Sequence, residues 1–231
     1  MDGQIRSRDS LQSAIDKPVV GSFGKYVSTG GRCRGGWFQP GRLAKPYWTI
    51  RASLLAMSER DEFVSWAFVI SSRYDHPARF VVEIARACAE SDKSVLIVVA
   101  DFSRAEISTA AALGAEAGRF DVLIGDEEAH IIHATGIPRI DVMPVGRACN
   151  ATLLGRLRVL AIYNLCPGWP RQTTESSLSQ RPSRCLRAAR PRPDATIIVA
   201  RAGATSYQNL GRSLRTLSVL RMSLAGQVLR G

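Results

Sequence analysis

From residue 46 onward, apolar residues recur with the spacing of helices and strands. Ile50, Leu54 and Met57 stand at i, i+4 and i+7, which predicts a helix over Trp48–Ser58 with one apolar face. The stretch Phe63–Ile70 is rich in β-forming residues and predicts a buried strand. The first well-patterned part of the chain is therefore a helix followed by a strand.

A second helix and a second strand follow at once. Proline is well tolerated at a helix start, so Pro77 predicts a helix over Ala78–Ser91. The nearly continuous apolar run Ser94–Asp101 is typical of a parallel strand that is covered on both faces. Strand, helix and strand of these lengths imply a parallel sheet with a right-handed crossover.

Two segments without apolar periodicity divide the rest of the chain. Residues 1–45 are polar, and we expect them to lack structure. Residues 165–194 contain five prolines and six arginines, which is typical of a disordered insert. We therefore expect one α/β domain in two parts, over 46–164 and 195–231. Its further elements are a helix near Ile107–Leu113, a helix or turn from Phe120–Ile124, a helix over Glu127–His133, a strand over Ile137–Gly146, a helix over Asn150–Tyr163, a strand and turn over Ala195–Gly203, a helix over Thr205–Met222 and an edge strand over 225–231.

The segment 165–194 also suggests a hypothesis about its origin. Recognisable pattern lies on both sides of it, and its arginine-rich text is what a GC-rich gene gives when it is read out of frame. The coding DNA tests this directly. If no shift of one or two bases restores an apolar strand that ends in Asp, the segment is not frameshifted.

The net charge of +11 is concentrated in the flanks. Residues 1–50 hold eight Lys/Arg and three acids, residues 51–164 hold twelve and fifteen, and residues 165–231 hold eleven and two. A nucleic-acid-binding fold more often carries its charge on a structured face, so we expect no specific nucleic-acid partner. The basic flanks could still contact anionic surfaces.

Several classes of protein are disfavoured by composition. No apolar run approaches the roughly 18–20 residues that span a bilayer, and the first residues lack the apolar stretch of a signal peptide. We therefore expect a cytoplasmic location. The five cysteines show no CxxC spacing, which argues against a zinc site or a disulfide framework.

Four stretches, in order, resemble the cytoplasmic domain of bacterial polysaccharide co-polymerases, the tyrosine autokinases known as BY-kinases. The sequence "TIRASLLAMS" is similar to the family's helix before the first strand, and "FVISS" with "IARACAESDKSVLIVVADFSR" is similar to its strand, phosphate-loop helix and second strand. The other two are "FDVLIGDEEAHIIHATGIPRIDVMPVGR" and "ATIIVARAGATSYQNLGRSLRTLSVL". Together they cover roughly residues 47–160 and 194–231.

The resemblance implies an α/β fold with a P-loop-NTPase-like parallel sheet flanked by helices. It also implies an ATPase or tyrosine-kinase activity, with ATP and Mg²⁺ as cofactors, that regulates exopolysaccharide or capsule biosynthesis and export. A membrane-spanning polysaccharide export or co-polymerase subunit is then the implied partner. Such a partner would hold this chain peripherally at the inner membrane.

The phosphate-binding loop departs from the family. Such a loop wraps phosphates in successive backbone N–H groups, its glycines permit the wrap, and its lysine reaches the outer phosphates. Here Tyr74–Phe80 occupies that place without a glycine or a lysine, one residue short, and Pro77 lacks an N–H group. Ser72, Asp75 and Arg79 are the remnant loop positions. Arg79 either mimics the lysine or is a solvated arginine in the first turn of the helix.

The acids of the family's metal site are also reduced. The second strand should end in Asp-x-Asp, but here it ends in Val99-Ala100-Asp101. Asp101 is either a remnant catalytic acid or a helix cap or turn residue. The family's third strand, which is apolar and ends in Asp, is replaced by residues 165–194, so we expect an incomplete sheet that lacks a central strand. The family's tyrosine-rich C-terminal tail is absent as well.

A metal site elsewhere has little support. His130 and His133 stand at i, i+3 on the helix expected there, with Glu127 one turn earlier. Together they could form a metal-binding face, but two histidines on a helix surface are the simpler interpretation. We therefore predict no metal site.

Three losses in one site favour a catalytically inactive relative, that is, a pseudo-enzyme with a degenerate Walker A motif, or a gene remnant, without a bound cofactor. Removing a single preorganised donor can already cost about 10²–10³ in rate. The first alternative is an ATP-dependent tyrosine kinase or ATPase that is still active with an atypical loop. The second is a non-enzymatic module whose basic flanks bind anionic lipid or nucleic acid.

Overall fold

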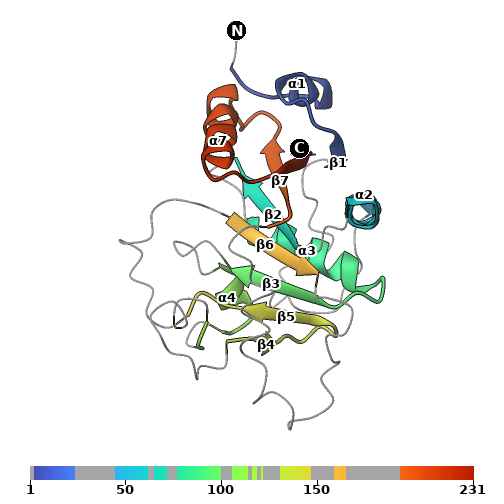
Figure 1. Ribbon diagram of the computed structural model, residues 1–231, viewed down its shortest axis with the longest axis vertical. Helices are drawn as coiled ribbons and strands as arrows, with labels where there is room; N and C mark the ends of the chain where they lie inside the picture. Colours follow the sequence, from blue (N-terminus) through green and yellow to red (C-terminus); the bar gives the residue numbers. More distant parts are fainter. Residues whose placement is uncertain are drawn as a thin grey trace.

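The fold was analysed in a computed structural model. It describes residues 3–23, 45–61, 65–71, 77–99, 106–113, 116–118, 121, 131–146, 159–164 and 193–231. One sheet of eight strands runs through the molecule in the order β1-β8-β7-β2-β6-β3-β5-β4 (Figure 1). The strands are β1 Val19–Phe23, β2 Ser65–Ile70, β3 Val95–Val99, β4 His133–Ala134, β5 Ile140–Met143, β6 Val159–Asn164, β7 Ala195–Arg201 and β8 Leu224–Arg230.

Most neighbouring strands in this sheet are parallel. The pairs β1–β8, β8–β7, β7–β2 and β3–β5 are parallel, whereas β6 is antiparallel to both of its neighbours and β4 is antiparallel to β5. The strands β2 and β3 therefore point in the same direction on either side of β6. This arrangement confirms the predicted α/β fold with a mainly parallel sheet.

Helices cover both faces of the sheet. One face packs against α2 (Lys45–Asp61), α3 (Pro77–Ala89) and α4 (Glu106–Ala110), and the other against α1 (Arg8–Ala14) and α7 (Tyr207–Val219). Side chains of β7 alternate between the two cores, with Ile197 and Val199 in the first and Ile198 and Ala200 in the second. The alternation is the period of two that places successive strand side chains on opposite faces.

The sequence predicted most of these elements. The expected helices over Trp48–Ser58, Ala78–Ser91 and Thr205–Met222 are α2, α3 and α7. The expected strands before and after α3 are β2 and β3. Elements also form at three other expected spans: α4 overlaps the helix near Ile107–Leu113, β5 lies within Ile137–Gly146 and β7 lies within Ala195–Gly203.

The prediction that residues 1–45 lack structure is wrong for residues 3–23, which form α1 and β1. Ile5 and Leu11 are fully buried against α7 and β8, in the core that lies on that face. The side-chain amide of Gln227 on β8 donates to the carbonyl of Lys17 at 2.6 Å, which fixes the turn between α1 and β1. Residues 24–44 lie outside the described part of the chain.

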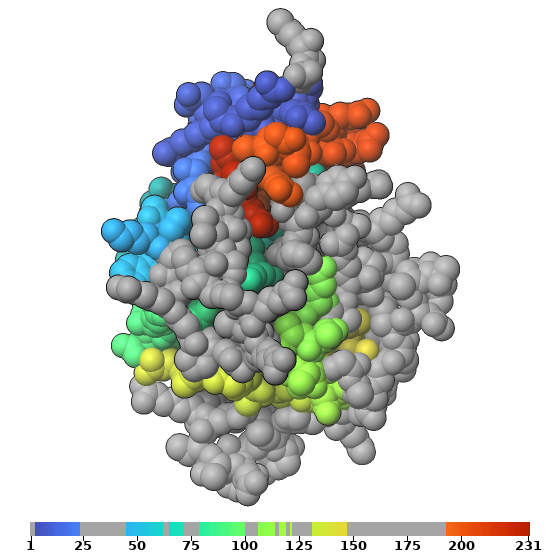
Figure 2. Space-filling view, turned by 180° about the vertical axis from the view of Figure 1, so that it is seen from behind, coloured from blue at the N-terminus to red at the C-terminus, as the bar shows by residue number. Residues whose placement is uncertain are grey.

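The sequence predicted that the last strand lies at the edge of the sheet, and this prediction is wrong. β8 pairs with β7 on one side and with β1 on the other, so β1 is the edge strand. Figure 2 shows residues 3–23 in blue against the orange and red residues of α7 and β8. The two ends of the described chain therefore pack against each other.

A strand occupies the position that was expected to be empty. The predicted helix over Asn150–Tyr163 is wrong for its last residues, because β6 spans Val159–Asn164 and pairs with both β2 and β3. The part of that span before Val159, and residues 165–192, lie outside the described residues. The sheet therefore has no gap between β2 and β3, and the expected loss of a central strand is wrong.

The helix predicted over Glu127–His133 is also wrong at its end. His133 begins β4, and Ile131 and Ile132 have no helical structure. Residues 127–130 lie outside the described part of the chain, as does the predicted turn over Phe120–Ile124 apart from Asp121.

Candidate functional site

The frame of a phosphate-binding site lies where β2 leads into α3. The strand β2 ends at Ile70 and is followed directly by Ser71, and α3 begins at Pro77. Ser72 and Asp75 belong to the intervening loop, which lies outside the described residues, and so does Asp101. Of the four residues that the sequence singled out, the structure places Arg79.

Strand register sets how far apart the two strand ends of this frame lie. Phe68 of β2 and Val99 of β3 both pair with Leu160 of β6, so they stand at the same level of the sheet. Neighbouring strands are about 4.8 Å apart, so β2 and β3 run about 10 Å apart. Both strands point toward the same sheet edge, where ligands bind in open α/β sheets.

The central strand brings its carboxyl end to the opposite edge. β6 is antiparallel to β2 and β3, so its last residue, Asn164, pairs with Val95 at the start of β3. The end of β6 at Asn164 is therefore on the far side of the sheet from the ends of β2 and β3. In a parallel strand at this position, the residue after the strand would point to the candidate site.

Arg79 has an acidic partner on its own helix. Its Nε atom lies 3.8 Å from Oε1 of Glu83, and the Arg79 side chain is about one-third exposed. Glu83 also accepts a hydrogen bond from Arg86 at 3.0 Å, and Glu83 and Arg86 are both buried. The attraction to Glu83 holds the Arg79 guanidinium along α3. The role of Arg79 at a phosphate stays a prediction.

A buried hydroxyl pair, which sequence reasoning did not select, lies at the start of the loop. Ser71 Oγ donates to the carbonyl of Val199 at 3.0 Å and lies 3.4 Å from Oγ1 of Thr205. The Thr205 hydroxyl also accepts from the backbone N–H of Arg201 at 2.8 Å. These bonds fix Ser71 against the turn after β7. The signal was present in the sequence, since both residues lie in stretches that resemble the kinase family.

The N-terminal segment closes over the same turn. The Ile5 N–H donates to the Thr205 carbonyl at 2.9 Å, and the Gly203 N–H donates to the Ile5 carbonyl at 2.8 Å. Tyr207, the first residue of α7, donates its N–H to Gly3 at 2.9 Å. The turn that supports Ser71 is thus held by residues from the opposite end of the sequence.

A second loop contact joins Asp121 to Gly146, which lies after β5. Asp121 is buried and its Oδ2 accepts from the Gly118 N–H at 2.8 Å. Gly146 lies against this carboxylate with a φ of +110°, and a Cβ at Gly146 would stand 2.2 Å from Asp121 Oδ2. Glycine is required there for both the backbone angle and the close approach. This contact joins the two ends of the third family-like stretch.

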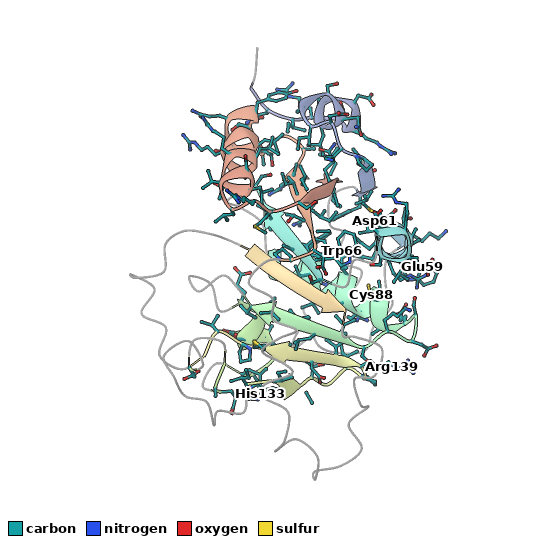
Figure 3. The ribbon with its side chains drawn as sticks, in the orientation of Figure 1. Glu59, Asp61, Trp66, Cys88, His133 and Arg139 are labelled. Carbon is teal, nitrogen blue, oxygen red and sulfur yellow. The ribbon has the colours of Figure 1, made fainter. Side chains whose placement is uncertain are left out.

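The possible metal-binding face of Glu127, His130 and His133 is described only at His133. His133 lies on β4, at the opposite end of the sheet from β1, and its Nε2 is 2.8 Å from the carbonyl oxygen of Ala117 (Figure 3). Its candidate partners Glu127 and His130 lie outside the described residues. Among the residues that are described, no three His, Cys, Asp or Glu side chains are grouped as metal ligands.

Cys88 offers no nucleophile to the site. It lies on α3 beside Leu54 and Trp66, in apolar surroundings between α2 and the sheet (Figure 3). Burial raises the pKa of the Cys88 thiol to about 11, although the positive charge of Arg51 opposes the shift. The thiol is therefore protonated at neutral pH, and thiols react as thiolates.

Solved structures with a similar fold include two that are named as tyrosine-kinase domains and one chimerical protein. The structure named "BceF Tyrosine Kinase Domain" aligns with a TM-score of 0.70 at 16% identity, and covers 99% of this chain and 99% of that chain. The chimerical protein CapA2B2 aligns at 0.66 and 15% identity, covering 97% and 98%. The kinase domain of the Escherichia coli tyrosine kinase ETK aligns at 0.58 and 16% identity, covering 94% and 91%.

No family model and no curated protein matches this sequence. The chain has the fold of bacterial tyrosine-kinase domains, which confirms the fold that the four sequence stretches implied. Within the described residues, no helix combines the length and the apolar character needed to cross a bilayer.

Proposed function

We propose that this chain is a catalytically inactive relative of bacterial tyrosine-kinase domains, and that it acts as a binding module in exopolysaccharide or capsule production. The observation that carries the proposal is the sequence between β2 and α3. Ser72 to His76 reads Ser-Arg-Tyr-Asp-His, and α3 then begins with proline. The loop has the position of a phosphate cradle without the glycines and the lysine that make one.

The charges near this loop support the same conclusion. Asp75 adds a carboxylate where the phosphates of ATP would bind. Arg79, the nearest cation on α3, is already attracted by Glu83 at 3.8 Å. A triphosphate would therefore meet one like charge and a cation that is shared with a buried acid.

The central strand supports it independently. A kinase site of this fold needs carboxylates at the sheet edge to place Mg²⁺ and to activate the attacking hydroxyl. The strand β6 runs antiparallel and ends in Asn164 at the other edge. Asp101 is then the one acid that the sequence offers directly after β3, where the family has Asp-x-Asp.

A module of this kind would act through contacts. The implied partner is a membrane-spanning subunit of polysaccharide export, which would place the chain at the cytoplasmic side of the inner membrane. The fold offers such a module a stable scaffold, because a hydrophobic core lies on each face of the sheet.

Calorimetric titration with ATP and Mg²⁺ tests the loss of function. We expect no binding with a Kd tighter than about 1 mM, which corresponds to about −4 kcal/mol. Incubation with radiolabelled ATP should leave the five tyrosines unmodified. Micromolar affinity that is lost on Arg79→Ala or Asp101→Ala would establish the alternative, an active ATP-dependent enzyme with an atypical loop. Arg60→Ala, at an exposed position on α2, is the matched control.

A further inference from the structure

The outward face of α7 carries a row of exposed residues with helical spacing. Gln208, Arg212, Arg215 and Val219 stand at i, i+4, i+7 and i+11 and are all exposed. The opposite side of the helix is buried through Leu210 and Leu217. Residues with this spacing lie along one face of a helix, and the row is about 16 Å long.

The row is part of a strongly basic region. Residues 195–231 contain five arginines and no Asp or Glu. Arg212, Arg215 and the nearby Arg221 are exposed, and none of them has an ion-pair or hydrogen-bond partner within the described part of the chain. Their charges are therefore available to an external partner.

An apolar side chain completes the row. Val219 is 81% exposed and lies one turn beyond Arg215. A single exposed valine is ordinary on a protein surface. At the end of a helix face that carries Arg212 and Arg215, it gives the combination that interfacial helices use, in which cations contact headgroups and an apolar residue enters beneath them.

We propose that the α7 row, Gln208–Arg212–Arg215–Val219, binds an anionic membrane surface directly. The helix lies at one end of the molecule with its outer face on the surface, away from β4 and β5 (Figures 1 and 2). A single convex row meets a plane along its whole length. It does not surround a nucleic-acid strand, and charge complementarity selects acidic headgroups over neutral ones.

This proposal differs from a contact made by residues 1–45 or 165–194, because it assigns the charge to the helix α7. It does not depend on the state of the nucleotide site. It predicts which residues control binding, and Lys45 and Lys93 provide a matched pair, since both are exposed lysines outside α7, at the start of α2 and between α3 and β3.

Vesicle co-sedimentation tests it, with phosphatidylcholine vesicles that contain or lack phosphatidylglycerol, at about 0.15 M salt and below. We expect the full chain to bind the acidic vesicles only. Arg212→Gln with Arg215→Gln should weaken partitioning about 25-fold, at about fivefold for each arginine. Val219→Ser should weaken it about threefold by removing apolar contact with the lipid.

Controls separate the outcomes. Lys45→Gln with Lys93→Gln removes the same charge and should bind almost as the parent does, and Arg212→Lys with Arg215→Lys should retain most binding. Equal thermal unfolding of the variants excludes misfolding. The proposal is overturned if the parent ignores acidic vesicles, if the Arg212/Arg215 variant binds like the parent because the flanks act instead, or if duplex DNA binds more tightly than vesicles at equal salt.

Discussion

The helices α3 and α7 are both 13 residues long and both follow a parallel strand, but they face different surroundings. Every residue of α3 from Phe80 to Ala89 is buried, and its internal charges, Glu83 and Arg86, bind each other. On α7, Leu210 and Leu217 are buried, while Arg212 and Arg215 are exposed and unpaired within the described residues.

The difference separates two functions of the scaffold. A helix that is buried on all sides stabilises the fold through its packing. That contribution does not depend on a neighbouring active site. A helix with one buried side and an unpaired basic side is available for partners. The α3 region therefore contributes mainly to the stability of the fold, and the α7 region is where an external contact is expected.

The largest expected effect is a cavity in the α3 region. Ile84 is fully buried, and Ile84→Ala should lower the free energy of unfolding by about 3 kcal/mol through lost burial and an unfilled cavity. Val219→Ala on the exposed side of α7 should change it by less than about 0.5 kcal/mol. Urea denaturation measures both. Similar losses for the two variants would remove the distinction between the helices.

The next effect concerns the buried charges of α3. Glu83→Gln removes the carboxylate that Arg86 binds at 3.0 Å in a buried position, and we expect a loss of about 2–3 kcal/mol in unfolding free energy. The control is the exposed pair Arg60–Asp61, whose atoms lie 2.7 Å apart, because Asp61→Asn should leave stability unchanged within error. If Glu83→Gln leaves the unfolding free energy unchanged, the charges of α3 are solvated.

Replacing two glycines with alanine should change the stability in opposite directions, at Gly21 of β1 and at Gly211 of α7. A Cβ on Gly21 of β1 would stand 2.3 Å from Cγ1 of the buried Ile50, so Gly21→Ala should cost about 1–3 kcal/mol. A Cβ on Gly211, within α7, meets nothing within 4 Å, so Gly211→Ala should stabilise by about 0.5–1 kcal/mol. Thermal melts measure both. A harmless Gly21→Ala would argue against the packing of residues 3–23 on α2.

The smallest effect depends on pH. Burial raises the pKa of the Asp141 carboxyl on β5, so the folded state binds this proton more tightly than the unfolded state does. Ionisation therefore opposes folding, and the penalty appears as pH rises through the raised pKa and is absent below the ordinary value near 3.9. Asp141→Asn should raise the Tm at pH 7, with a smaller gain toward pH 4. A gain that is constant with pH would contradict this cause.

The sequence predicted α3 and β3 because their apolar patterns are long and unbroken. It missed α1 because a seven-residue helix with one buried leucine gives almost no periodic signal; Leu11 is packed by residues of α7 and β8 that are distant in sequence. It assigned Val159–Tyr163 to a helix because a short apolar run fits either structure, and pairing with β2 and β3 decides.

The position of the candidate site could be predicted from the sequence, but the contacts that hold its loop could not. The frame between β2 and α3 followed from the strand–helix–strand pattern. The contact of Ser71 with Thr205 did not, because these residues are 134 positions apart and are brought together by the pairing of β2 with β7. The strand at His133 was missed because it spans only two residues, and its pairing with β5 is a contact that the apolar pattern does not show.

The most direct test of the central claim is thermal unfolding of the full chain with and without ATP and Mg²⁺. A ligand that binds the native state must raise its apparent stability. We expect one cooperative transition whose Tm moves by less than about 1 °C with ligand in excess, because each kcal/mol of binding stabilisation shifts Tm by about 2–4 °C. A shift of about 5 °C or more, equivalent to ligand at about 100 times its Kd, would show that the nucleotide site is intact.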